Sequence, residues 1–464
     1  MNLRWITLAA LVAASCTGLG IASPAGAALA NVQWNPLATT GAPPADGGLM
    51  AYDAASHQMI FFGGGAVTPG NSYSNETWQL TGSSWTQLSP VNSPSPRQYS
   101  SMAYDPATGT IVLFGGSSGG TLSGHTWTWN GSTWSQVTTS TGPSPREGAS
   151  LAYDPATGTM ILFGGLDNSG GYLNDTWSWD GSSWSQMAIT SPTSPSPRFL
   201  ASLAYDPATQ TMVLFGGNSA GTDDGDTWVL NTSAGYWLQV PSTPSPLPRN
   251  SASFVYDPAT GTDILFGGNN PNQGLADTWS WSDGQWTQLS PTQYPSARYG
   301  AAMEYNPSLS EMELFGGIAA GSGLPLTDTL TLSATPNPPS QTTPSATNGQ
   351  LTVNFTPSNL SGSGTVTSFE VFVSTTSGGE NYQSTPAATC GAPATSCTVN
   401  GLTNGQTYYA TVEAVNSVGA SPPSNQESVT VGVAPSISAA TITGTPSVGQ
   451  TLTAHSSGVT GTPT

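Results

Sequence analysis

The sequence repeats one phrase of about 50 residues along most of its length. The phrase contains PSPR, AYDPATGT, LFGG and DTWSW in that order, and consecutive copies are 49 to 52 residues apart. A tyrosine marks each of six copies at Tyr52, Tyr104, Tyr153, Tyr205, Tyr256 and Tyr305. Short apolar alternations separated by Gly, Pro, Asn and Asp turns indicate strands, and this period predicts one small antiparallel sheet per copy. We therefore predict an all-β fold in which six four-stranded blades form a propeller over residues 31–333.

The first and last copies indicate how the ring closes. The first five copies end in a strand around a second tryptophan, whereas the sixth runs into TLTLSATP and has none. A matching segment, NVQWNPL with Trp34, stands before the first copy. We expect this N-terminal strand to complete the sixth blade, because such a latch leaves no open sheet edge between first and last blades.

The repeat resembles the kelch repeat, which has paired glycines after its second strand, aromatic residues spaced across its third and fourth strands, and Pro-Arg before its first strand. Here the glycines are Gly115 and Gly116 and their equivalents in the other copies. Paired glycines allow positive φ and a close approach of neighbouring blades. The resemblance implies a kelch-type propeller. It does not imply the copper site of the galactose oxidases, since the propeller has no cysteine and only two histidines, His57 and His125.

The first 30 residues have the features of a signal peptide: Arg4, an apolar run, and small residues before a cleavage point near Ala30. An alternative is a lipoprotein acylated at Cys16. No later run is long and apolar enough for a membrane span, so we expect a secreted or cell-surface protein. We also expect the protein to be a monomer. Without Arg4, 25 acidic residues face five arginines and there is no lysine, giving a net charge of −20. Nucleic acid is therefore not expected as a partner.

A different pattern begins after the propeller. Alternating segments such as TSFEVFVS and TYYATVEAVN predict a β-sandwich domain at residues 334–432. The segment SATPNPPSQTTPSAT, residues 333–347, is rich in Pro, Ser and Thr, and we expect it to be the linker that leads into this domain. The run Gly401–Gly405 followed by Tyr408 and Asn416 resembles a fibronectin type III domain. Cys390 and Cys397 are the only cysteines after the signal peptide, and we expect a disulfide between them. Residues 433–464 resemble the start of a bacterial immunoglobulin-like repeat. This segment is too short to form a core of its own, so we expect the chain to be part of a longer protein.

Arginines and tryptophans recur at fixed positions in the repeat. Each arginine precedes the first strand of a blade, and we expect it to pair with an aspartate before the third strand rather than to line a ligand site. These structural arginines are Arg97, Arg146, Arg198, Arg249 and Arg298. Their recurrence favours packing roles for the tryptophans as well, with Trp129, Trp179 and Trp281 more open to a binding role than the others.

One set of loops varies where the rest of the repeat does not. The turns DPATGT and NGST barely change, whereas the loop between the second and third strands differs in every copy. Chain direction places these loops on the face that also carries the connections between blades, so this face is the expected ligand-binding surface. The candidate contacts are Asn71, Tyr73, Tyr172, Asn174, Asp223, Asp224, Asn269, Asn270 and Gln273.

The sixth copy carries two carboxylates where the others have aliphatic residues. Glu304 and Glu313 would face each other across two strands if residues 306–311 form a tight turn. Two such groups repel, so they need a shared proton or a cation. They are weak candidates for a calcium site or for an acid/base pair resembling that of glycosidases. The alternative is that both simply face water in the channel.

From the sequence we expect a noncatalytic binding or scaffold protein that recognises carbohydrate or an extracellular protein through the loop face, with no cofactor except calcium in the pair above. The alternatives are an extracellular polysaccharide hydrolase or lyase and a purely structural module of the cell envelope.

Overall fold

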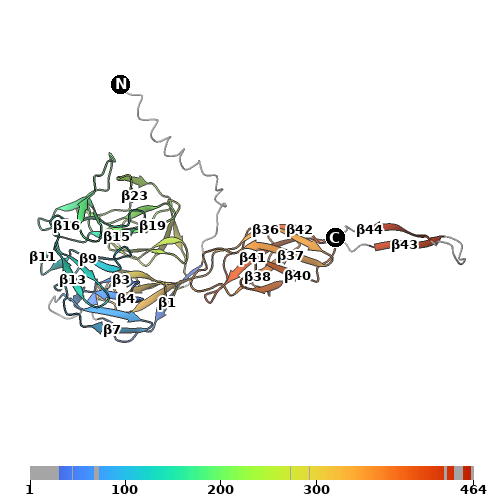
Figure 1. The fold of residues 1–464 in the computed structure, drawn as a ribbon, viewed down its shortest axis with the longest axis horizontal. Coiled ribbons are helices and arrows are strands. Elements are labelled where there is room, and N and C mark those ends of the chain that lie inside the picture. Colours follow the sequence, from blue (N-terminus) through green and yellow to red (C-terminus); the bar gives the residue numbers. More distant parts are fainter. Residues whose placement is uncertain are drawn as a thin grey trace, which may run out of the picture.

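The computed structural model describes residues 31–43, 45–66, 73–271, 273–291, 293–432, 436–443 and 453–460. A propeller lies at one end, a β-sandwich follows it, and the hairpin of β43 (Ser436–Thr443) and β44 (Thr453–Thr460) lies beyond the sandwich (Figure 1). The predicted signal peptide, residues 1–30, lies outside the described residues. Among the residues that are described, we find no helix with the length and apolarity that a bilayer crossing requires.

The propeller is built from antiparallel sheets that follow one another along the chain, and each blade is numbered here by its order. Blade 1 comprises β3 (Leu49–Asp53), β4 (Gln58–Phe62), β6 (Thr77–Thr81) and β7 (Ser84–Leu88). Blade 2 comprises β8 (Ser101–Asp105), β9 (Thr110–Phe114), β12 (Thr126–Trp129) and β13 (Trp134–Val137). Blade 3 comprises β15 (Ser150–Asp154), β16 (Thr159–Asp167), β17 (Tyr172–Trp179) and β18 (Trp184–Gln186).

The later blades repeat this order. Blade 4 comprises β19 (Ser202–Asp206), β20 (Thr211–Phe215), β23 (Thr227–Asn231) and β24 (Tyr236–Val240). Blade 5 comprises β25 (Ser253–Asp257), β26 (Thr262–Phe266), β29 (Thr278–Ser282) and β30 (Gln285–Leu289). Blade 6 comprises β32 (Ala302–Asn306), β33 (Glu311–Phe315), β35 (Thr329–Ala334) and, from the other end of the chain, β1 (Val32–Leu37).

The N-terminal strand closes the ring, as the sequence predicts. β1 pairs antiparallel with β35 from Val32↔Ala334 to Leu37↔Thr329. The innermost strands contact their neighbours around the ring, and β32 contacts β3 to complete it. No edge is left open between blades 1 and 6, which removes a site for edge-to-edge aggregation.

Each outer strand carries a tryptophan that fastens it to the preceding blade. Trp134 of blade 2 packs 5.1 Å from Phe62 of blade 1, centroid to centroid, and its Nε1 donates a 2.9 Å hydrogen bond to Thr77 of the same blade. The same bond recurs around the ring, including Trp34 to Thr278 and Trp85 to Thr329. Burying an indole while satisfying its N–H explains why this position is tryptophan in every blade.

The structure corrects the expectation that Trp129, Trp179 and Trp281 are more open to a binding role. All three are buried, with at most 1% of their surface exposed. Each packs against the outer-strand tryptophan of its own blade, with ring centroids 5.1 to 5.5 Å apart. They fill the space between blades and have no surface to offer a ligand.

The glycine pairs after the second strand adopt the backbone that the sequence indicates. Gly115 has a φ of 73° and Gly116 a φ of 92°. A Cβ on Gly115 would lie 2.7 Å from the carbonyl oxygen of Arg146 in the next blade. Glycine is therefore required both by the left-handed conformation and by the close approach of the neighbouring blade.

The β-sandwich has two sheets whose facing side chains form a separate core. Its strands are β36 (Ser340–Thr347), β37 (Gln350–Thr356), β38 (Ser368–Ser374), β39 (Ala388–Gly391), β40 (Ser396–Asn400), β41 (Thr407–Val415) and β42 (Glu427–Thr430). Much of the segment predicted to be a linker is strand β36, whose Gln341 and Pro344 point inward. Only residues 335–339 separate the last propeller strand from the sandwich.

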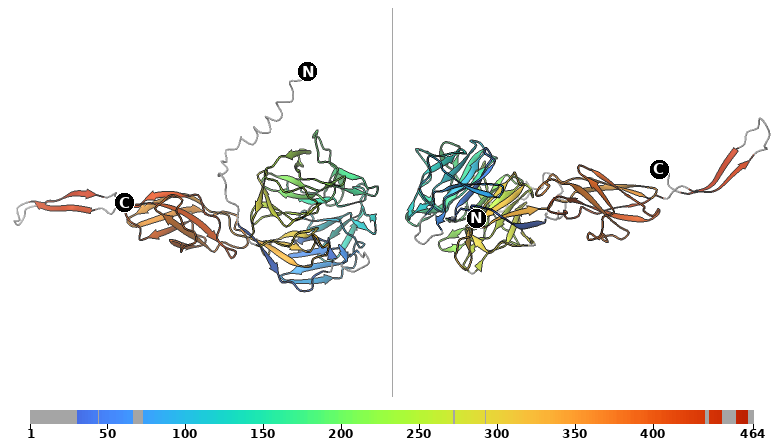
Figure 2. Two further views of the ribbon diagram at one scale, coloured as in Figure 1. Left: turned by 180° about the vertical axis from the view of Figure 1, so that it is seen from behind. Right: turned by 90° about the horizontal axis from the view of Figure 1, so that it is seen from below.

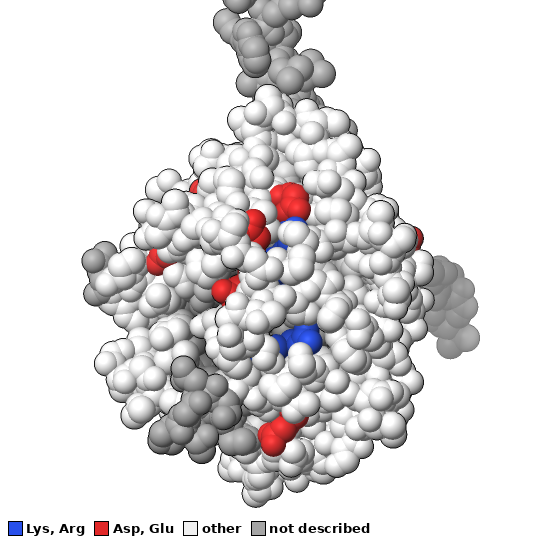
Figure 3. All heavy atoms as spheres, turned by 90° about the vertical axis from the view of Figure 1, so that its left-hand side faces the viewer, with Lys and Arg blue, Asp and Glu red and all other residues white. Residues whose placement is uncertain are grey.

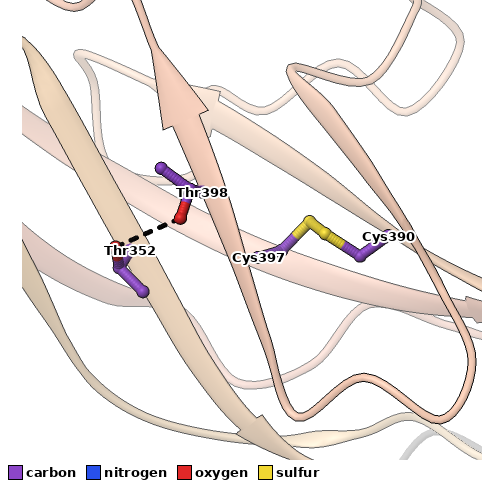
Figure 4. The surroundings of a disulfide bond; sticks show 4 residues. All are labelled: Thr352, Cys390, Cys397 and Thr398. Carbon is purple, nitrogen blue, oxygen red and sulfur yellow. Dashed lines mark hydrogen bonds between the residues drawn. A yellow bond between two sulfur atoms is a disulfide. The ribbon is translucent and has the colours of Figure 1, made fainter.

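The disulfide joins the two sheets of the sandwich. Cys390 on β39 is bonded to Cys397 on β40 with a Cα–Cα distance of 5.9 Å (Figure 4). On the other side of β40, the Thr398 hydroxyl lies 3.3 Å from that of Thr352 on β37. The bridge thus closes a short loop at the place where the chain crosses between sheets.

The sandwich contacts the propeller through the loop that contains Gly362 and through Asn416. The backbone N–H of Gly362 donates to the carbonyl oxygen of Ala259, in the turn between β25 and β26. Asn416 donates to the carbonyl oxygens of Ala334 and Ser363, which ties the sandwich to the end of β35. Strand β11 (Thr121–Leu122), by contrast, lies at the side of the propeller away from the sandwich (Figures 1 and 2).

Candidate functional site

The loops between second and third strands share one face with the connections between blades, here called the loop face. Short pairs of strands or single bridges join the two sets of segments in each blade. The strand pairs are β2 (Ala45–Asp46) with β5 (Gly65–Ala66), β14 (Arg146–Glu147) with β16, and β31 (Arg298–Tyr299) with β34 (Ile318–Ala319). The bridges are Gln98↔Ser117, Phe199↔Asn218 and Asn250↔Asn269. The loop face is therefore held in place by backbone hydrogen bonds.

Three loops are further ordered as small hairpins. They are β10 (Ser117–Ser118) with β11, β21 (Asn218–Ser219) with β22 (Thr222–Asp223), and β27 (Asn269–Asn270) with β28 (Gln273–Gly274). Seen from the side away from the sandwich, most of the propeller surface is uncharged, and acidic and basic side chains lie side by side near its middle (Figure 3). A ligand approaching this side meets mainly uncharged groups.

Several predicted contacts form one cluster in blades 3 to 5. The Asp223 carboxylate accepts hydrogen bonds from Asn218 and Asn250, both 2.7 Å long, through Oδ1. Its Oδ2 is buried without a hydrogen-bond partner. The Tyr172 hydroxyl lies 3.4 Å from the Asn218 side chain, and its ring packs on Phe199. These residues connect adjacent loops, so they shape the loop face as well as offering groups to a ligand.

The other candidates are more separate. Asp224 lies 3.5 Å from Nε of Arg198 and accepts from Ser219, while burial raises its pKa. Asn270 donates to the carbonyl oxygen of Pro248 and is flanked by Asn269. Asn174 and Gln273 are exposed, and Tyr73 is half-buried beside Gly65. Asn71 lies outside the described residues.

The central channel opens beneath these loops. It encloses about 590 Å³ and is lined by the innermost strands, with Glu304 among its lining residues. Backbone hydrogen bonds link successive blades at its rim: Gly148 to Tyr99, Leu200 to Gly148, Ser251 to Leu200 and Gly300 to Ser251, with lengths of 2.7 to 3.0 Å. This rim fixes the width of the channel on the loop face.

Glu304 and Glu313 occupy directly opposite positions in the ladder of β32 and β33. Glu313 is fully buried; its Oε1 accepts a 3.2 Å hydrogen bond from Asn306, and its Oε2 has no partner. Glu304 is half-buried and accepts from the backbone N–H of Tyr305. Burial raises the pKa of each glutamate to about 7. The structure thus brings the pair together, in a setting that favours the protonated form.

The described residues contain no group of three or more His, Cys, Asp or Glu side chains arranged to hold a metal ion. Calcium at the Glu304–Glu313 pair remains a prediction. The two opposed carboxyl groups can share a proton. The carboxyl group of Glu313 is buried, however, and it contacts Asn306 rather than the channel.

Four of the five arginines form bidentate ion pairs. Each is about 1% exposed and its guanidinium Nη1 lies 2.6 to 2.7 Å from the aspartate that precedes the third strand. The pairs are Arg146–Asp175, Arg198–Asp226, Arg249–Asp277 and Arg298–Asp328. Each Nη1 also donates to the first glycine after the second strand, for example Arg146 to Gly164. These arginines hold the base of each variable loop.

Arg97 differs from the other four. It is nearly as buried as they are, at 3% exposed, but among the described residues it donates hydrogen bonds to backbone and hydroxyl groups of Ser95, Gly115 and Ser123 and to no carboxylate. The residue in the aspartate position of its blade is His125. Lining up that one column of the repeat would have revealed the difference from sequence alone.

Comparison with known families agrees with this architecture. A model of the KLHDC2/KLHL20/DRC7 Kelch-repeats domain matches residues 125–317, and a model of the fibronectin type III domain matches residues 337–430. No curated protein matches the chain. The chain is thus an all-β modular protein. It carries a kelch-repeat domain followed by a fibronectin type III domain, a combination that indicates a noncatalytic role in protein interaction or as a scaffold.

Proposed function

We propose that this protein is exported and that the loop face of its propeller recognises an extracellular carbohydrate. The observation that supports this most is the contrast within the repeat. The arginine before the first strand and the turns on the opposite face are nearly the same in every copy. The loops between the second and third strands, by contrast, differ from blade to blade. A rigid scaffold with individual loops is the usual arrangement of a recognition surface.

The chemistry of the loop face favours a neutral polar ligand. Its candidate contacts are mainly amides and tyrosines, with Asp223 largely engaged by two asparagines. Amide groups supply both donors and acceptors, which suits sugar hydroxyl groups, and tyrosine adds an apolar ring face. The sandwich lies on the other side of the propeller and leaves the loop face open.

The test is a screen of glycans and extracellular polysaccharides with the chain from residue 31 onwards. A triple variant, Tyr73→Ala, Asn174→Ala and Gln273→Ala, changes accessible loop side chains in three blades. The matched control, Gln136→Ala, Gln186→Ala and Gln239→Ala, changes exposed side chains of the outer strands. We expect the parent and the control to bind and the loop variant to bind at least about tenfold more weakly. Binding that is equal in all three would place the ligand elsewhere, and no binding by the parent would exclude the glycans screened.

A hydrolase is the second candidate, since burial raises the pKa of both Glu304 and Glu313 to about 7. A carboxyl group that stays protonated near neutral pH can act as a general acid. Product analysis of every polysaccharide bound in the screen tests this candidate, with Glu304→Gln as the inactive comparison because Glu304 lines the channel.

A further inference from the structure

In three blades a single aspartate accepts hydrogen bonds from two buried groups. Asp175 takes Nη1 of Arg146 on one oxygen, at 2.6 Å, and Nη2 of the same arginine on the other, at 2.9 Å. The second oxygen also accepts from Nε1 of Trp177, at 2.7 Å. Blades 4 and 5 repeat the arrangement with Trp228 on Asp226 and Trp279 on Asp277. We call the place of this carboxylate the carboxylate position.

Blade 2 keeps both donors and lacks the acceptor. His125 stands where the aspartate should be, and its side chain is exposed. Nη2 of Arg97 donates only to the Ser95 hydroxyl, whereas in blade 3 the equivalent atom donates to a serine and to the aspartate. Nε1 of Trp127 is buried and has no hydrogen-bond partner. A buried N–H left without an acceptor is unfavourable because it has lost its hydrogen bonds to water, so the two donors favour an acceptor between them.

No described carboxylate side chain fills the gap. Among the residues whose side chains the structure describes, no Asp or Glu forms an ion pair with the Arg97 guanidinium, whereas Arg146, Arg198, Arg249 and Arg298 each form one. Burial without a counter-charge lowers the pKa of Arg97 to about 10, which is still high enough to keep it cationic at neutral pH.

The carboxylate position is within reach of solvent. In the other blades the aspartate side chains that occupy it are 18 to 45% exposed, while their arginines are nearly inaccessible. The replacement of Asp by His therefore leaves two preoriented donors at the base of a position that opens on the loop face. Ser123, whose hydroxyl lies 3.2 Å from Nη1 of Arg97, adds a further polar group beside it.

We propose that blade 2 binds the carboxylate group of a ligand at this position, between Arg97 and Trp127. One ligand oxygen takes the place of Asp175 Oδ2 and accepts from both Nη2 of Arg97 and Nε1 of Trp127. An arginine fork binds planar carboxylates with two parallel hydrogen bonds, and a carboxylate fills the equivalent position in blades 3 to 5, so a carboxylate is the expected ligand. The inference does not depend on the proposed carbohydrate ligand, because a free carboxylate is sufficient as a probe.

The experiment titrates acetate, at constant ionic strength with chloride, into the mature chain labelled with ¹⁵N at tryptophan. The indole N–H signal of Trp127, assigned with Trp127→Phe, should shift and saturate. His125→Asp supplies the missing carboxylate from the chain itself, so it should abolish the acetate response while moving the Trp127 signal towards those of Trp177 and Trp279. Asp175→His copies the blade 2 arrangement into blade 3, and it should add a second indole signal, from Trp177, that responds to acetate.

Glucuronate serves as a second probe and distinguishes two sources of the carboxylate. Saturation by both compounds means that the position admits a carboxylate carried on a larger ligand, whereas saturation by acetate alone means that it takes only a small free anion. The proposal is overturned if the Trp127 signal does not respond to acetate, or if it responds equally in His125→Asp. Neither result bears on the glycan screen, so failure here and failure of the proposed function can be told apart.

Discussion

Arg146 and Asp175 form two parallel hydrogen bonds of 2.6 and 2.9 Å at the base of the third blade, with Arg146 almost completely inaccessible. Burial raises the pKa of Asp175, but the hydrogen bonds from Arg146 and Trp177 outweigh it and hold the pKa below its usual range. Arg146 lies in the connection that leads into blade 3, and Asp175 lies at the end of the variable loop of that blade, so the ion pair holds these two segments together. It therefore joins the constant part of the propeller to the part expected to bind a ligand.

Replacing Asp175 with Ala should destabilise the propeller by about 3 kcal/mol, because it leaves a buried guanidinium without a counter-charge. The equivalent Asp328→Ala should cost less, about 1 to 2 kcal/mol, since the Asp328 side chain is 45% exposed against 22% for Asp175. Denaturant unfolding followed by tryptophan fluorescence measures both. Equal costs would show that burial does not set the strength of these pairs.

Glu313 should make the propeller less stable as the pH rises. Its pKa is about 7 in the folded protein, against an ordinary value of 4.5 for a glutamate, so the unfolded chain releases the proton first as the pH rises. The protonated Glu313 contributes its full stabilisation below pH 4.5. This contribution is lost as the pH rises from 4.5 to about 7, and the free energy of unfolding falls by about 3 kcal/mol over that range.

The measurement compares the free energy of unfolding from pH 4 to 8 in the parent and in Glu313→Gln. Because Gln does not titrate, the variant should lose less stability over this range than the parent. Parallel curves for the two proteins would show that Glu313 ionises freely in the folded state.

Gly362 controls the junction between the propeller and the sandwich. Its φ is +66°, and a Cβ at this position would collide with the carbonyl oxygens of Ala334 and Thr335. Gly362→Ala should therefore uncouple the two domains, and two thermal transitions should separate further in calorimetry. Gly378→Ala is the matched control, because it has a φ of +69° but no atom near the added Cβ. The same effect in both variants would point to backbone strain alone.

Removal of the disulfide should affect the sandwich and leave the propeller unchanged. The double variant Cys390→Ala and Cys397→Ala should lower the stability of the sandwich by about 2 to 3 kcal/mol, the chain-entropy value for a short loop. All 14 tryptophans after residue 30 lie in the propeller, so in the chain from residue 31 onwards tryptophan fluorescence follows that domain by itself. A shift of the tryptophan transition in the double variant would contradict the independence of the two cores.

Much of the fold could be predicted because the same pattern of strands and turns recurs in six copies of the repeat. The alternation of apolar residues located the strands, and the missing fourth strand of the last copy identified Trp34 as its replacement. The opposition of Glu304 and Glu313 followed from the length of one turn. These are local patterns, and local patterns are visible in a sequence.

The errors concern contacts between blades and between domains. Trp129 and its equivalents follow the strand pattern, but only the position of the adjacent outer strand shows that they are buried. Pro344 and its neighbours have the composition of a linker, and it is pairing with β37 that makes them a strand. The missing aspartate partner of Arg97 becomes visible only when the copies of the repeat are aligned, because His125, 28 positions away, occupies the aspartate position.

The most direct test of the account is amide hydrogen exchange of the chain from residue 31 onwards, with and without the tightest-binding glycan from the screen. We predict that the glycan slows exchange in the variable loops, around residues 73–75, 117–124, 172–174, 218–225 and 269–274, and leaves the turns on the opposite face unchanged. Slower exchange confined to those turns, to the channel strands around Glu304 or to the sandwich would contradict recognition by the loop face.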